Sequence, residues 1–117
     1  MEKRKIAVVS DSGSVRNTLN DNLEKLNYNV LIIVNNKRGI EKLLTEKPDI
    51  IILDLNSLLK EGNRLIKDLS TNQRIAGTKI LVITSEDKLK KFALISEIDE
   101  FILAPLSIPE IEHRILK

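Results

Sequence analysis

The segment from Pro48 to Asn56, Pro-Asp-Ile-Ile-Ile-Leu-Asp-Leu-Asn, sets the tightest limit on how this chain can fold. Four consecutive large apolar residues, 50–53, lead directly into Asp54. An unbroken apolar run of this kind is typical of a strand buried on both faces, as at the centre of a parallel sheet. Ligands of such sheets bind at the carboxyl ends of the strands, so Asp54 is a candidate site residue. The alternative, that Asp54 only caps the following turn, stays open from this segment alone.

Composition excludes several classes of chemistry. The 117 residues predict one domain, residues 1–117. The absence of cysteine rules out disulfides, thiolate metal sites and cysteine nucleophiles, and it favours a cytoplasmic protein. A single histidine, His113, argues against histidine metal clusters and Ser-His-Asp hydrolysis. A net charge of +2 with 3% aromatic residues does not favour nucleic-acid binding, and no apolar run is long enough for a membrane span. Carboxylates, hydroxyls, amides or a bound metal ion must therefore carry the chemistry.

Apolar strands alternate with amphipathic helices along the whole chain. Strands are expected at residues 5–9, 30–34, 50–53, 80–83 and 99–103. Helices are expected at residues 14–26, over about ten residues before Pro48, around residues 65–69 after a loop reaching Gly62, around residues 89–95, and after Ser107. Ser107 and Glu110 form a capping box, and the helix that follows should bury Ile111, Ile115 and Leu116. The alternation predicts a doubly wound five-stranded parallel sheet with strand order 2-1-3-4-5.

Polar residues follow three of these strands at one edge of the predicted sheet. Asp11 follows the first strand, Asp54 the third, and Thr84 the fourth. In the order 2-1-3-4-5 the first and third strands are neighbours, so the two carboxylates should face each other at the topological switch point. Two close carboxylates repel each other unless a cation lies between them, and oxygen ligands favour Mg²⁺. The alternative is that both acids only cap the helices that follow them.

The order and spacing of four segments resemble the receiver domain of two-component response regulators. The segments are Val8-Val9-Ser10-Asp11, Ile51-Ile52-Leu53-Asp54, Val82-Ile83-Thr84-Ser85 and Phe101-Ile-Leu-Ala104-Pro105. The resemblance implies a flavodoxin-like (βα)5 fold in which Asp54 accepts a phosphoryl group from a histidine kinase or phosphotransfer protein. It also implies Mg²⁺ held by Asp11, Asp54 and the backbone carbonyl of Asn56. Thr84 would bind a phosphoryl oxygen, and the Phe101 ring would turn inward as Thr84 moves.

Among the departures from the family pattern, two fall at positions of the expected site. The first of the two acids that usually close strand one is Ser10, and the lysine that usually precedes the strand-five proline is Ala104. That lysine pairs with the phosphoryl group in the family, so its loss affects the readout of phosphorylation. Another cation such as Lys88 is a candidate substitute. The alternative function is a pseudo-receiver, a protein-interaction or dimerisation module whose state does not depend on phosphate.

The resemblance also bears on partners. It implies an output domain or partner protein contacted through the fourth helix, fifth strand and fifth helix, and a homodimer is compatible with it. No enzymatic activity on another substrate is expected, and neither direct nucleic-acid binding nor membrane binding. A third function class is a small nucleotide- or cofactor-binding α/β domain. The turn Asp11-Ser-Gly-Ser14 has one glycine where a dinucleotide fingerprint has three, which disfavours this class.

Overall fold

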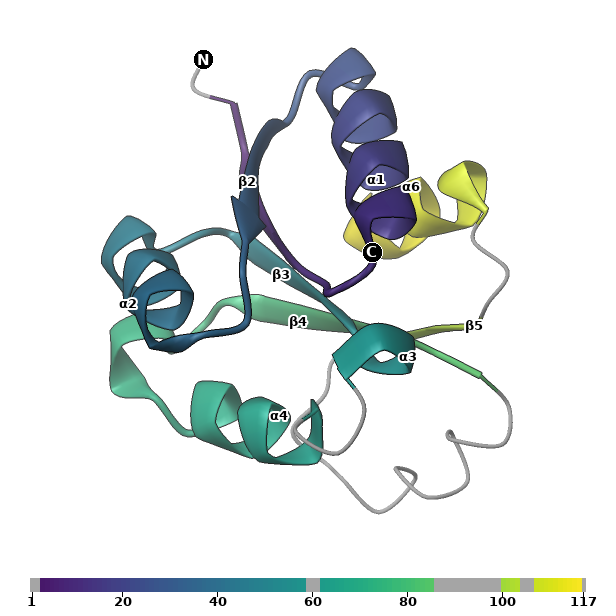
Figure 1. Cartoon of the computed structure of the whole chain (residues 1–117). Coiled ribbons are helices and arrows are strands. Elements are labelled where there is room, and N and C mark those ends of the chain that lie inside the picture. The colour runs from purple at the N-terminus through teal and green to yellow at the C-terminus, as the bar shows by residue number, and fades with distance from the viewer. Residues whose placement is uncertain (1–2, 59–61, 86–99, 104–106, 117) are drawn as a thin grey trace.

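The protein is a single twisted sheet with helices on both faces (Figure 1). The computed structural model describes residues 3–58, 62–85, 100–103 and 107–116. Five parallel strands lie in the order β2-β1-β3-β4-β5, which confirms the predicted doubly wound sheet. Their bounds are β1 Lys5–Val9, β2 Asn29–Ile33, β3 Ile50–Asp54, β4 Lys79–Thr84 and β5 Glu100–Leu103. Every residue of β3 is buried, as expected for a central strand.

The helices form a layer on each face of the sheet, and Figure 1 shows α1 and α6 on one face and α2 and α4 on the other. The bounds are α1 Gly13–Lys25, α2 Lys37–Glu46, α3 Leu55–Leu58, α4 Gly62–Ser70, the 3-10 helix η2 Gln73–Ile75, and α6 Ile108–Leu116. Because strand side chains alternate between faces, the core has two apolar clusters, each including alternate residues of β3. None of the helices in the described ranges is long and apolar enough to cross a membrane.

Side-chain caps fix the start of three helices. The Ser12 hydroxyl accepts the Val15 N–H, and Asn36 Oδ1 accepts the Gly39 N–H at 2.7 Å. The predicted cap Ser107 accepts the Glu110 N–H at 3.4 Å. These bonds satisfy amides that have no partner inside their own helix, so the cap residues set where each helix begins.

Two details of the prediction are wrong. The segment after Asp54 is not loop throughout, because Leu55–Leu58 form a helical turn whose two leucines are buried. Leu116 is 68% exposed rather than buried. Ile111 and Ile115 lie four residues apart on the buried face of α6, and the next residue is rotated about 100° away from them. The helix predicted around residues 89–95, with Lys88, lies outside the described residues.

Candidate functional site

The register between β1 and β3 brings Ser10 next to Asp54. Val9 pairs with Leu53, so the next step along both strands places Ser10 beside Asp54. The Ser10 hydroxyl donates a hydrogen bond to Asp54 Oδ2 at 2.8 Å, and both side chains are buried. The predicted meeting of the two strand exits is therefore seen, but the side chain that touches Asp54 is the serine.

The Asp54 carboxylate is buried among neutral groups. It is 2% exposed, and its Oδ1 accepts the Asn56 N–H at 3.2 Å. A buried carboxylate is costly unless hydrogen bonds or an opposite charge compensate it. The partners that the described residues provide are a hydroxyl and an amide, which leave its negative charge unneutralised. The bond to Oδ1 matches the predicted alternative of a cap on the next turn, whereas the bond to Oδ2 does not.

Asp11 follows Ser10 in the chain, but its side chain has different surroundings from that of Asp54. Its side chain is exposed, and its N–H donates to Ser57 Oγ at 2.8 Å. The side-chain cap of α1 is Ser12, so capping of this helix does not explain Asp11. The strand exits thus combine one exposed and one buried carboxylate.

Ser57 is a site residue that the sequence analysis missed. Its hydroxyl accepts from Asp11 N–H, donates to the Asp54 carbonyl at 3.1 Å and lies 3.3 Å from Ser10 Oγ. Arg16 was missed as well, and its guanidinium donates to the Ser10 carbonyl at 3.3 Å. In the sequence, Ser57 is recognisable only as a hydroxyl residue three positions after Asp54. Its role depends on α3, which turns Ser57 back toward the end of β1.

The structure describes the remaining predicted site residues in different detail. Thr84 ends β4, is fully buried, and donates to the Ser85 carbonyl at 3.4 Å. The β4 partner of Asp54 is Ile83, so Thr84 stands one residue beyond the level of Asp54. Phe101 lies in β5 opposite Val82, and the direction of its side chain stays a prediction. Ala104 lies outside the described residues.

The donors at this edge are compatible in kind with Mg²⁺. Asp11, Asp54 and the Asn56 carbonyl offer only hard oxygen atoms, and Mg²⁺ typically takes one or two carboxylates and keeps several waters. Within the described ranges no cluster of three or more acidic, histidine or cysteine side chains is poised for a metal. The set therefore has two carboxylates, with Ser10 adding a neutral oxygen beside them.

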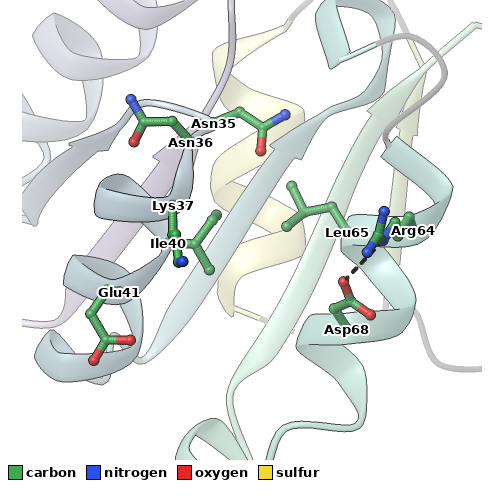
Figure 2. A pocket seen from close by; sticks show the side chains of 8 residues that line it. All are labelled: Asn35, Asn36, Lys37, Ile40, Glu41, Arg64, Leu65 and Asp68. Atoms are coloured by element: carbon green, nitrogen blue, oxygen red, sulfur yellow. Dashed lines mark ion pairs between the residues drawn. The ribbon is translucent and has the colours of Figure 1, made fainter.

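A separate open pocket of about 510 Å³ lies between α2 and α4 (Figure 2). Neither Asp54 nor the residues bonded to it line this pocket. Its described lining residues are Asn35, Asn36, Lys37, Ile40, Glu41, Arg64, Leu65 and Asp68. On one wall Arg64 and Asp68 form an ion pair, with 3.9 Å between Arg64 Nε and Asp68 Oδ2. Among the lining residues that the structure describes there is no aromatic side chain to stack a base, which does not favour the nucleotide-binding class.

The sheet order and the acidic carboxyl edge define a flavodoxin-like α/β domain with its polar residues at the switch point. The sequence profile of the response regulator receiver domain matches residues 6–116. The chain belongs to this family, as the resemblance predicted.

Individual relatives agree with this assignment. The chain is 30% identical over 112 residues to the alkaline phosphatase synthesis transcriptional regulatory protein PhoP of Bacillus subtilis, covering 96% of this chain and 47% of that protein. It is 34% identical over 113 residues to the response regulator ArlR of Staphylococcus saprophyticus, covering 95% and 50%. The chain thus spans about half the length of these two relatives. The chemotaxis response regulator CheY4 of Vibrio cholerae has the same fold, with a TM-score of 0.84 at 20% identity and 98% of each chain covered.

Proposed function

We propose that this receiver domain accepts a phosphoryl group on Asp54 in two-component signal transduction. The observation that carries the proposal is the buried Asp54 carboxylate at the carboxyl end of the central strand, bonded by neutral donors only among the described residues. Such a group has unneutralised charge and a fixed orientation, as a nucleophile that works by positioning requires.

The transfer needs little from the protein beyond position. An oxygen of Asp54 attacks the phosphorus of a phosphohistidine on a histidine kinase or phosphotransfer protein. The new P–O bond forms as the P–N bond breaks, and the histidine nitrogen leaves with the electron pair and takes up a proton. Asp11, Asp54 and the Asn56 carbonyl are the residues that would hold Mg²⁺, which when bound would supply electrostatic stabilisation of the transferring group. Thr84 and Phe101 are the proposed switch residues that respond to the adduct.

The partners follow from the same family membership. We propose that the domain acts in the cytoplasm. We also propose that it passes its state to an output domain or partner protein, because the relatives are about twice as long as this chain. A surface of the fourth helix, fifth strand and fifth helix of the predicted (βα)5 scheme is the proposed contact, and it is open to a homodimer. We propose no enzymatic activity on a separate substrate.

One observation favours the pseudo-receiver as second candidate. The Ser10 hydroxyl occupies Asp54 Oδ2 at 2.8 Å, so the carboxylate is already tied down without any ligand. A domain of this kind would present a constant surface to its partner. The two candidates differ in whether Asp54 reacts.

Reaction with a small phosphodonor separates them. We expect the folded domain, given Mg²⁺ and acetyl phosphate, to gain one phosphoryl group by intact mass spectrometry, and we expect Asp54→Asn to gain none. The matched control is Asp49→Asn, because Asp49 lies just before the same strand at its opposite end, where Oδ2 accepts the Lys5 N–H. Asp49→Asn should keep the adduct. A folded wild-type domain that stays unmodified would support the pseudo-receiver.

A further inference from the structure

A positively charged side chain, that of Arg16, is joined to Asp54 through one intervening residue. Arg16 is the fourth residue of α1, and its guanidinium donates a hydrogen bond to the Ser10 carbonyl at 3.3 Å. Ser10 in turn donates from its hydroxyl to Asp54 Oδ2 at 2.8 Å. In the part of the chain that the structure describes, no other cationic side chain is hydrogen-bonded to Asp54 or to a residue bonded to it. Arg16 is therefore the cation of this edge of the sheet.

The helix directs the Arg16 side chain toward the end of β1. Side chains of an α-helix lean toward its N-terminus, and a Cβ built on Gly13 would lie 3.7 Å from Arg16 Nη2. The half-buried guanidinium thus lies over the first residue of α1, beside the exit of β1. A guanidinium has five N–H donors. Within the described ranges that of Arg16 makes one hydrogen bond, to a neutral carbonyl, so its charge is not cancelled by a carboxylate there.

The position of Arg16 bears on the reaction proposed for Asp54, and the inference rests on that proposed function. The reaction brings an anionic phosphodonor to a carboxylate that is 2% exposed and has neutral hydrogen-bond partners among the described residues. A fixed positive charge beside such a site attracts the donor. We propose that Arg16 is a positioning residue for phosphoryl transfer: its guanidinium fixes the end of β1, and with it the Ser10 hydroxyl on Asp54, while its charge favours the approach of the donor.

The rate of reaction with acetyl phosphate tests the proposal. Initial rates of phosphoryl gain, followed by intact mass spectrometry at fixed Mg²⁺ and several acetyl phosphate concentrations, give an apparent second-order rate constant. Arg16→Gln removes the charge but keeps a residue of good helix propensity, and we expect it to lower this rate constant by about tenfold. Arg16→Lys keeps the charge but not the guanidinium fork, and its rate constant should stay within about threefold of the wild type.

Ionic strength separates an effect of charge from a merely structural one. The ratio of the wild-type rate constant to that of Arg16→Gln should shrink by about half or more as KCl rises from about 0.02 M to about 0.5 M, because salt screens the charge. Lost packing alone would leave the ratio unchanged. The matched control is Arg38→Gln, which removes the same charge from an exposed position in the first turn of α2. Its rate constant should stay within about twofold of the wild type.

The outcomes separate this inference from the proposed function. If wild type reacts at Asp54, then equal rate constants for Arg16→Gln and Arg38→Gln, or a ratio that does not change with salt, overturn the role of Arg16 alone. A wild-type domain that gains no phosphoryl group contradicts both. Urea unfolding establishes that each variant is folded. If Arg16→Gln does not fold, Arg16→Met, which keeps an unbranched apolar stem without the charge, takes its place under the same criteria.

Discussion

Gly39 in α2 lies directly against the backbone of Val34, just after β2. A Cβ built on Gly39 would lie 1.9 Å from the Val34 carbonyl oxygen and 2.9 Å from the Val34 carbonyl carbon. Both are backbone atoms, which cannot move aside as the end of a long side chain can. The missing side chain of Gly39 is therefore what allows the short connection from β2 into α2.

Replacement of this glycine by alanine should destabilise the fold. Alanine gains about 1 kcal/mol of helix propensity over glycine, but the clash with Val34 should outweigh this gain and leave a net loss of about 2 kcal/mol. Urea unfolding followed by circular dichroism measures the change. In the control, Gly13→Ala, the added Cβ would only meet the flexible end of Arg16 at 3.7 Å, so stability should be unchanged or slightly higher. A Gly39→Ala protein as stable as Gly13→Ala would contradict the proposed close approach.

Single residues also show which parts of the site are predictable from sequence. Asp54 stands out because it is an acid directly after an apolar run, and Asp11 because it lies two residues after one, at positions where packing does not call for an acid. Ser57 does not stand out, because its role depends on the turn of α3 that brings its hydroxyl to the Asp11 N–H. The bond from Ser10 to Asp54 depends on the strand register, which a single sequence does not specify.

At the scale of elements, an ion pair ties the first residue of β1 to the last residue of α2. The Lys5 ammonium lies 3.0 Å from Glu46 Oε2 and also donates to the Glu46 carbonyl. The hydrogen bond and charge of Lys5, with a smaller contribution from Lys42, hold the pKa of Glu46 below its ordinary value of 4.5. Both side chains are partly exposed, so the pair contributes little.

This pair predicts a small pH dependence of stability. A lowered carboxyl pKa in the folded state stabilises the protein above pH 4.5, and this stabilisation disappears as the pH falls through the lowered pKa. Glu46→Gln should therefore be slightly less stable than the wild type at pH 7, and the difference should vanish in acid. Urea titrations at several pH values measure it, with Glu24→Gln on the exposed face of α1 as the control for loss of one charge. A difference that grows in acid would have the wrong sign.

The longer elements are predictable from periodicity, and the shortest are not. β1 begins and ends as predicted, and α2 ends before Pro48, with Lys47 in the left-handed conformation as its C-cap. The short helices α3 and η2 have four and three residues, less than or close to one helical turn. A segment this short has no apolar repeat from which to predict a helix.

At the scale of the whole molecule, the two apolar clusters share one sheet. Ile51 belongs to the cluster under α2 and α4, and Ile52 belongs to the cluster under α1 and α6. Both side chains are fully buried. Adjacent residues of β3 pack into opposite clusters. If either cluster unfolds, β3 is displaced and the other cluster loses its contacts with the strand as well.

This arrangement predicts one cooperative transition. Ile51→Val and Ile52→Val should each lower the free energy of unfolding by about 1 kcal/mol, and urea transitions followed by circular dichroism and by Tyr28 fluorescence should coincide in both variants. Tyr28 packs on the α1 and α6 side only. Leu116→Ala, at an exposed position, is the control and should have little effect. A Tyr28 transition that shifts for Ile52→Val but not for Ile51→Val would indicate that the layers unfold separately.

The seam between β1 and β3 is bonded beyond the strands at both ends. At the amino edge Asp49 Oδ2 accepts the Lys5 N–H at 2.7 Å, and at the carboxyl edge Ser10 donates to Asp54. A strand pair held in this way acts as a fixed frame, against which other parts of the domain can shift. Under the proposed function, a change at Asp54 is expected to be felt at Thr84, which lies one residue beyond Ile83, the β4 partner of Asp54.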